Sequence, residues 1–439
     1  MVGNRPFHRS RAVALSCLVL ALCLGASAAS AVELRGHGGP VRAIAVTPDS
    51  ATAVTGSFDS TVILWSLADG RARQVLRFHA GQVTAVAALS NDRFASAGED
   101  GRIAIWQAGR ETPAAVLEGH TAPVAALSWS PEQGVLASAS WDSTVRLWTL
   151  ETGQSRTLSG HTGNVNAVAF RSDGSVVSAS YDAAVRLWPK DANAAPSIRT
   201  LPTALNTLAV LPGDRLALGG ADGRLRVLSA AGQAIGEVEI SPTPIIALAV
   251  SADGRTIAAA GLKGAISLLD AETLQPRHRL SGPGLPVWSL AFTPDSRILL
   301  TGGSDRVVRR WDVKTGAQMD AGVGFAPHDE ASAFEDEPGA RVFKACAACH
   351  ALSADAGNRA GPTLHGVFGR KIASVPGYPY SAALRGMDIV WTPETVARLF
   401  EVGPQTYTPG TKMPEQTINS AEDRAALVRF LEKATSEHR

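Results

Sequence analysis

Residues 119–148 read GHTAPVAALSWSPEQGVLASASWDSTVRLW, and this stretch decides the fold of most of the chain. Short runs rich in apolar and β-branched residues are separated by turn residues, as in strands joined by tight turns. In the last run, Val145 and Leu147 face one side while Arg146 and Trp148 face the other. The stretch therefore predicts a unit of short antiparallel strands.

The same pattern recurs with a period of about 41 residues, which is typical of a repeat architecture. Its markers are Gly36-His37, Phe78-His79, Gly119-His120 and Gly160-His161; Asp59, Asp100, Asp142, Asp182, Asp222 and Asp305, with Lys263 in the one gap; and Trp65, Trp106, Trp148, Trp188 and Trp311. A four-stranded unit of this length cannot bury its own apolar faces and must stack on its neighbours. We predict an all-β seven-bladed propeller.

These repeats resemble the WD-repeat family from Ala31 to about Gly316, and we place the propeller at residues 32–317. In that family a His, a Ser or Thr, an Asp and a Trp hydrogen-bond across each blade. The matching residues are His37, Ser57, Asp59 and Trp65; His120, Ser140, Asp142 and Trp148; and His161, Ser180, Asp182 and Trp188. One His and one Asp per blade is what a structural network produces, so no chemistry is assigned to them.

Two further features of the repeats carry expectations. The fifth and sixth units have Leu228 and Leu269 at the tryptophan position, so these blades should depend on packing instead. The segment Val32 to Arg35 precedes the first unit and could supply the outermost strand of the last blade. That strand would close the ring.

After the repeats, residues 346–350 read CAACH. Two thiols at this spacing can add to the vinyl groups of a haem while the adjacent imidazole reaches the iron. A redox-active dithiol and half of a zinc site are the alternatives. The first would need a βαβ setting and the second two further ligands at suitable spacing.

The surrounding sequence resembles class I cytochrome c, the soluble mitochondrial and bacterial type, over residues 336–439. The segments that carry the resemblance are GARVFKACAACH, GPTLHGVFGRK, PGYPYSAAL, the Trp of IVWTPET, YTPGTKMP and the last helix. The resemblance implies a C-terminal all-α domain with one covalently attached haem c.

The resemblance also implies the residues that hold the haem. Cys346 and Cys349 would carry it, His350 and Met413 would ligate the iron, and the Pro362 carbonyl would bind the second nitrogen of His350. A thioether is a soft, neutral ligand that favours reduced iron, so a His/Met pair suits an electron carrier.

Other matched positions surround the haem. The resemblance implies that Arg370, Tyr380 and Trp391 hydrogen-bond or neutralise the propionates and that Thr411 supports the same region. It also implies that Gly361 and Gly366 let the backbone approach the haem. Phe400 replaces a tyrosine that the family often has near the methionine, which removes a possible hydrogen bond to the sulfur. We take His365 as a loop or surface residue.

Ser420 and Asp423 have the spacing of a capping box that opens the last helix. The apolar residues Leu427, Phe430, Leu431 and Ala434 then share one face. By the resemblance, this face should pack on the helix that carries Cys346.

The N-terminus predicts export. Residues 1–31 contain three arginines, an apolar run from Ala12 to Leu24, and small residues that suit a signal peptidase. The apolar run is shorter than the ~17–25 residues that span a bilayer. We therefore expect a periplasmic protein with no stable membrane anchor in the mature chain, and an acidic linker at residues 318–335.

Charge is nearly balanced, with 41 Lys and Arg against 40 Asp and Glu. This balance gives no electrostatic footprint for nucleic acid, so we expect no nucleic-acid partner.

Our leading hypothesis is a secreted mono-haem c-type cytochrome that carries electrons between a redox protein donor and an acceptor and catalyses no bond chemistry. The propeller would be a docking platform for protein, which makes transfer effectively intramolecular. One alternative is a periplasmic oxidoreductase whose propeller binds a substrate or second cofactor. Another is a non-redox scaffold or sensor that responds to the haem.

Overall fold

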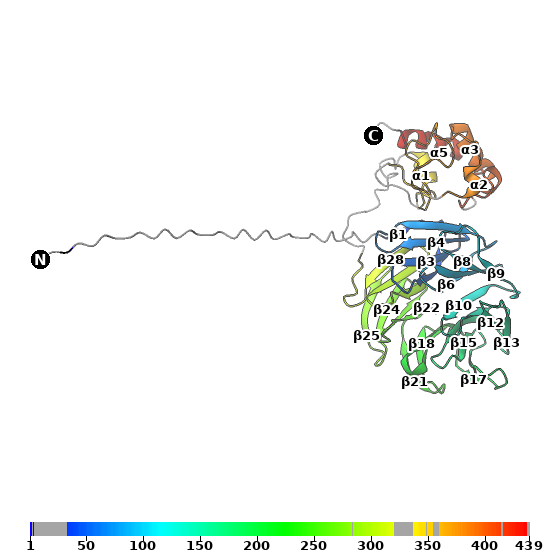
Figure 1. Ribbon diagram of the computed structural model, residues 1–439, viewed down its shortest axis with the longest axis vertical. Helices are drawn as coiled ribbons and strands as arrows, with labels where there is room; N and C mark the ends of the chain where they lie inside the picture. The colour runs from blue at the N-terminus through cyan, green and yellow to red at the C-terminus, as the bar shows by residue number, and fades with distance from the viewer. Residues whose placement is uncertain are drawn as a thin grey trace.

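The structure is a computed structural model, and it describes residues 33–282, 284–319, 337–347, 349–353, 360–378, 380–413 and 416–436, with Met1 and Gly3. Figure 1 shows a ring of β-sheets with a group of helices packed against its edge. Apart from Met1, Gly3, Gln318 and Met319, the predicted signal peptide and the predicted linker lie outside the described residues.

Each blade of the ring is a four-stranded antiparallel sheet, and the described residues form seven of them. The strands are β2 (Val41–Val46), β3 (Thr52–Ser57), β4 (Thr61–Ser66) and β5 (Ala72–Arg77) in blade 1; β6 (Val83–Ala88), β7 (Arg93–Gly98), β8 (Ile103–Gln107) and β9 (Ala115–Leu117) in blade 2; β10 (Val124–Ser130), β11 (Val135–Ser140), β12 (Thr144–Thr149) and β13 (Ser155–Ser159) in blade 3; β14 (Val165–Phe170), β15 (Val176–Ser180), β16 (Ala184–Trp188) and β17 (Ser197–Thr200) in blade 4; β18 (Leu205–Leu211), β19 (Arg215–Gly220), β20 (Arg224–Leu228) and β21 (Ala234–Glu239) in blade 5, with a 3-10 turn at Pro212–Asp214; β22 (Ile245–Val250), β23 (Thr256–Gly261), β24 (Ala265–Asp270) and β25 (Pro276–Ser281) in blade 6; and β26 (Val287–Phe292), β27 (Ile298–Gly303), β28 (Val307–Asp312) and β1 (Leu34–Arg35) in blade 7.

The N-terminal strand closes the ring, as expected. β1 pairs antiparallel with β28, with Leu34 opposite Val308 and Arg35 opposite Val307. The last blade therefore combines strands from both ends of the propeller sequence. This pairing covers the outer edge of β28 and ties the two ends of the propeller together.

The predicted hydrogen-bond network is present in blade 3. His120 Nδ1 lies 2.7 Å from Asp142 Oδ2, and His120 Nε2 lies 2.7 Å from Ser138 Oγ. Trp148 Nε1 donates to the same Ser138 hydroxyl at 2.8 Å. The network therefore links the loop before β10 to strands β11 and β12.

The hydroxyl in this network comes from a different residue than we predicted. In blade 3 it is Ser138 rather than Ser140, in blade 1 Thr55 rather than Ser57, and in blade 4 Ser178 rather than Ser180. The three serines that we predicted donate to backbone carbonyls instead. Residues two apart on a strand face the same side, so the sequence pattern allows both choices. The register of the strands, which sets Ser138 opposite Arg146, decides between them.

The blades without a tryptophan depend on packing, as expected. Leu228 and Leu269 are buried, each within a separate apolar cluster. In blade 5, Arg226 is also buried and pairs with Asp222 at 2.6 Å. Blade 5 therefore has an ion pair between Arg226 and Asp222 in place of the His, Ser, Asp and Trp network of blade 3.

Acidification should destabilise the propeller. Burial lowers the pKa of His120 and His161, so the unfolded chain takes up these protons first, below about pH 6.5. For Asp142, burial by itself favours a higher pKa, but hydrogen bonds from Thr144 and His120 outweigh this effect. The pKa of Asp142 is therefore lowered. Lowered values in both groups mean that stability is present at neutral pH and is lost as the pH falls. We expect the Tm to drop by several degrees between about pH 7.5 and 5, and further below about pH 4, in circular dichroism melts.

Histidine substitution provides the control for this prediction. The double variant His120→Gln and His161→Gln should melt lower at neutral pH but lose less on going to pH 5, because its side chains do not titrate. The comparison variant His278→Gln should keep the wild-type pH profile, because His278 lies outside the blade networks; its Nε2 lies 3.0 Å from the Lys314 carbonyl. A wild-type Tm that stays level between these pH values would contradict the prediction.

The C-terminal domain is helical. Its helices are α1 (Pro338–Phe343), α2 (Ala382–Arg385), α3 (Pro393–Val402), α4 (Pro404–Tyr407) and α5 (Ala421–Ala434). Ser420 caps α5 by accepting the Asp423 N–H at 3.1 Å. Phe430 on α5 contacts Phe343 on α1, with ring centroids 5.3 Å apart, so the predicted apolar face does pack on α1.

The CAACH segment differs from expectation in one respect. Cys346 lies in turns that follow α1 rather than within the helix itself. The His350 N–H still donates to the Cys346 carbonyl at 3.0 Å, so the backbone from Cys346 to His350 keeps one helical turn.

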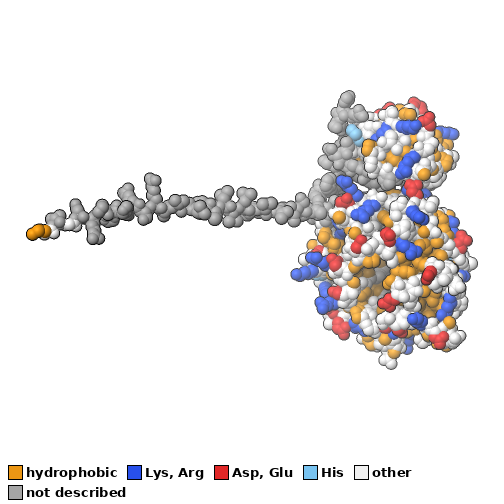
Figure 2. Space-filling model, viewed as in Figure 1, with side chains coloured by type: hydrophobic (Ala, Val, Ile, Leu, Met, Phe, Trp, Pro, Cys, Tyr) orange, Lys and Arg blue, Asp and Glu red, His pale blue; other side chains and the backbone are white. Residues whose placement is uncertain are grey.

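The surface of the described residues is mixed in charge. Figure 2 shows acidic and basic side chains interspersed over the visible face of both domains. None of the described helices is both long enough and apolar enough to cross a membrane.

Candidate haem-binding site

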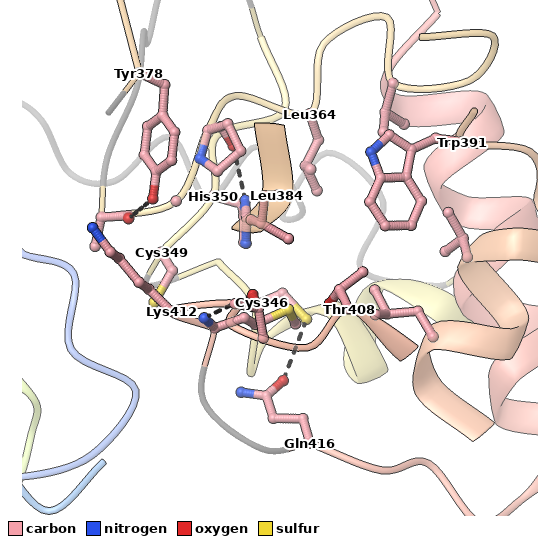
Figure 3. A pocket seen from close by; sticks show the side chains of 18 of the residues that line it. Cys346, Cys349, His350, Leu364, Tyr378, Leu384, Trp391, Thr408, Lys412 and Gln416 are labelled. Atoms are coloured by element: carbon pink, nitrogen blue, oxygen red, sulfur yellow. Dashed lines mark hydrogen bonds between the residues drawn. The ribbon is translucent and has the colours of Figure 1, made fainter. Parts of the chain in front are cut away.

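A cavity of about 1370 Å³, including its open mouth, lies within the helical domain where that domain meets the propeller. Ten of the eleven residues predicted to hold or surround the haem line it: Cys346, Cys349, His350, Gly361, Pro362, Arg370, Tyr380, Trp391, Thr411 and Met413; Gly366 is not among the lining residues. Figure 3 shows the two cysteines and His350 toward one end of this pocket and Trp391 across from them. The fold therefore brings together residues that are scattered over three loops and a helix boundary.

His350 is held in a defined orientation. Its Nδ1 lies 2.8 Å from the Pro362 carbonyl, which can only accept a hydrogen bond, so Nδ1 carries the proton. Nε2 is then the basic nitrogen, as a metal-binding imidazole requires. A Cβ on Gly361 would lie 2.4 Å from His350 Cε1, so only glycine leaves room for the ring in this position.

The surroundings of Cys346 do not suit a redox-active thiol. Cys346 is buried, and burial raises the pKa of its thiol to about 12. A thioredoxin-like nucleophile needs the opposite shift, because the thiolate is the reactive form. In the described part of the chain, no group of three or more His, Cys, Asp and Glu side chains is placed to hold a metal ion by itself.

Met413 lies on a tight loop that the domain anchors from both sides. Gly410 turns the chain with φ of 79°, in the left-handed region that glycine adopts without strain. Its carbonyl accepts a hydrogen bond from the Ser381 hydroxyl at 2.9 Å, and the Met413 N–H donates to Thr411 Oγ1 at 3.1 Å. The loop thus directs a half-buried thioether toward the same cavity as His350.

Arg370 has a structural role in addition to the predicted one. Its guanidinium donates to the carbonyls of His365 at 2.7 Å and Thr363 at 2.8 Å. It therefore ties together the loop that contains Pro362. Burial lowers the pKa of Arg370 and raises that of Tyr380 nearby, so this side of the cavity disfavours charge unless it is paired. Contact of Arg370, Tyr380 and Trp391 with propionates stays a prediction.

Tyr378 is a lining residue that is not among the predicted ones. Its hydroxyl donates to the Ala360 carbonyl, its ring meets Tyr380 edge-on at 4.6 Å, and burial raises its pKa. It lies two residues from Tyr380 in the PGYPY motif, and this closeness in the sequence is what could have identified Tyr378 as a lining residue. Four further lining residues come from the propeller: Gly36, Asp59, Thr61 and Val75.

The residues present fit a covalently attached haem. Cys346 and Cys349 supply two thiols for its vinyl groups, His350 and Met413 supply an imidazole and a thioether, and Gly361 leaves space at the ring of His350. When bound, the haem would supply a one-electron iron couple. The apolar walls would limit the access of water to that couple, and ligation by His350 and Met413 would favour its reduced form.

A ring of four-stranded blades joined to a helical domain with this pocket defines a propeller fused to a c-type cytochrome domain. Comparison with known families agrees. The family described as "WD domain, G-beta repeat" matches residues 29–66, 70–107, 111–149, 153–189 and 274–312. These are the regions of blades 1 to 4 and the end of the propeller, so blade 5 and most of blade 6 lie outside the matches.

The family described as "Cytochrome c" matches residues 337–435. Relatives include the cytochromes c of Cochliobolus lunatus, 46% identical over 98 residues, and of Sesamum indicum, 37% identical over 112 residues; these spans are 22% and 25% of this chain and 90% and 100% of the relatives. The cytochrome c of Arabidopsis thaliana is 46% identical over 98 residues, which are 22% of this chain and 87% of that protein. The chain belongs to the cytochrome c family through its C-terminal domain. That domain implies haem c binding and electron carrying, and the WD-repeat propeller implies a platform for protein interaction.

Proposed function

We propose that this chain is a secreted mono-haem c-type cytochrome that carries electrons between a redox donor and an acceptor in the periplasm. The observation that carries the proposal is the hydrogen bond of 2.8 Å from His350 to the Pro362 carbonyl, in a cavity that Met413 also lines. This arrangement prepares an imidazole and a thioether for one iron. Covalent attachment through Cys346 and Cys349 would keep the cofactor with the protein outside the cell.

The propeller has surface features suited to docking a protein. Trp141 and Tyr181 are 46% and 60% exposed. Both directly precede a network aspartate, as does Phe58 in blade 1, so the three aromatic residues lie at the same end of the ring. Exposed aromatic residues are enriched in protein interfaces, which supports this end as the platform.

Export and haem attachment can be tested together. The full chain, expressed in a host that matures c-type cytochromes in its periplasm, should be recovered there with one haem per chain and a single reversible one-electron titration. A chain without residues 1–31 should stay in the cytoplasm without covalent haem. Periplasmic protein that lacks haem would contradict the carrier function, and haem-loaded protein in the cytoplasm would contradict secretion.

A further inference from the structure

The propeller forms one wall of the haem cavity. Gly36, Asp59, Thr61 and Val75 of blade 1 line the same cavity as Cys349. The Gly36 carbonyl lies 2.9 Å from Cys349 Sγ, the sulfur of one of the two predicted attachment residues. Ala360 belongs to an apolar cluster formed by blades 7 and 1, and Cys349 packs against it. The side of the pocket at Cys349 therefore faces the propeller and not solvent.

Blade 1 lacks the side chain that covers this position in blades 3 and 4. In blades 3 and 4, an arginine two residues before the tryptophan lies over its ring, as Arg146 does over Trp148. In blade 1 the corresponding residue is Ile63, which is buried. A Cβ on Gly36 would lie 2.6 Å from Ala360 Cβ and 2.9 Å from Trp65 Cη2, so the cytochrome domain occupies the space against Trp65.

Polar contacts hold the loop of Met413 against blades 1 and 2. Arg77, at the end of β5, donates from Nη1 to the Met413 carbonyl at 2.7 Å. Glu111, before β9, pairs through Oε1 with Lys412 Nζ at 3.3 Å and accepts the Ala382 N–H at 3.1 Å through Oε2. We call Arg77 and Glu111 the latch. The latch therefore binds the loop that contains Met413, the candidate iron ligand.

We propose that the outer edge of blades 1 and 2 is an intramolecular docking surface that covers the haem edge at Cys349 and gates its access to protein partners. In the closed arrangement the propeller occupies the space that a redox protein would need. Electron exchange with such a protein then requires the latch to release. Release is feasible because partly exposed ion pairs are weak and contacts between domains of one chain are commonly mobile. The proposed gating of electron exchange rests on the proposed haem function. The contact between the propeller and the cytochrome domain does not depend on it.

The test compares the full-length latch variant Arg77→Ala with Glu111→Lys against a matched variant, Arg156→Ala with Glu132→Lys. The matched pair makes the same charge changes on blade 3, away from the cytochrome domain. Small-angle X-ray scattering measures the radius of gyration. Stopped-flow mixing of the ferrous protein with ferricyanide, and separately with a soluble blue-copper protein, measures removal of one electron by a small and a large oxidant.

The latch variant should show a larger radius of gyration, and its rate with the blue-copper protein should rise on the order of tenfold, because this rate scales with the fraction of open molecules. Its rate with ferricyanide should change by less than about threefold, since a small ion needs less opening. The matched variant should resemble the wild type. Adding Lys412→Glu to Glu111→Lys restores an opposite-charge pair and should recover part of both effects.

Two results separate the possible failures. A normal haem spectrum with unchanged scattering and an unchanged blue-copper rate in the latch variant would overturn the gate and leave the proposed function intact. Purified protein without a reducible haem would overturn the proposed function, while the scattering comparison would still report on the contact between the domains. A melt of the propeller like that of the wild type shows that the variant is folded.

Discussion

Replacing Met413 with alanine should lower the midpoint potential of the haem by on the order of 0.2 V, within the ~0.8 V range over which axial ligands tune such centres. The thioether favours reduced iron, and alanine offers no ligand in its place. The loop should remain, because its anchors are the Ser381 hydroxyl on the Gly410 carbonyl and the Arg77 guanidinium on the Met413 carbonyl. Spectroelectrochemical titration of the purified full chain measures the change.

The control for this prediction is Met387→Ala. Met387 follows α2 and is not among the residues that line the cavity, so its loss should leave the potential and the visible spectrum unchanged. A Met413→Ala protein with the wild-type spectrum and potential would show that another group completes the iron site.

Replacing both Cys346 and Cys349 with alanine should abolish covalent haem. After denaturing electrophoresis the wild-type band should stain for haem and the double variant should show almost none, because only thioether bonds survive denaturation. His350 and Met413 remain in this variant, so any bound haem should be extractable with acidified solvent.

Met413→Ala is the internal comparison for the cysteine variant, since it keeps both thiols and should retain its stain. Equal staining of the double cysteine variant and the wild type would contradict attachment at these two residues. Retention of half of the stain by each single variant would instead show that one thioether suffices.

The propeller was predictable from the sequence because its stability comes from repeated local contacts. Each blade buries its faces on its neighbours, so the period of the markers reports the architecture directly. Ring closure was predictable for the same reason, since β28 lacks an outer partner until β1 supplies it. The network hydroxyl was misplaced by two residues, because Ser138 and Ser140 share a strand face and a pattern of period two does not separate them.

The candidate residues of the haem site come from sequence motifs, and the structure brings ten of the eleven to one cavity; Gly366 is not among the lining residues. A CxxCH segment places its groups through the local chain, and the Pro362 and Met413 segments have recognisable turn sequences. Tyr378 was missed because two tyrosines lie close together in PGYPY, and only the tertiary structure shows that both rings enter the pocket.

By itself, then, the sequence determined the seven blades, the helical domain and the chemistry of the cavity, since each depends on local periodicity or on short motifs. Only the tertiary structure decided which blade meets the cytochrome domain and which residues cover Cys349. Gly36 and Ala360 are far apart along the chain, and neither Arg77 nor Glu111 belongs to a motif. Their contacts arise from the shapes and charges of two finished surfaces, which no repeat or spacing in the chain records.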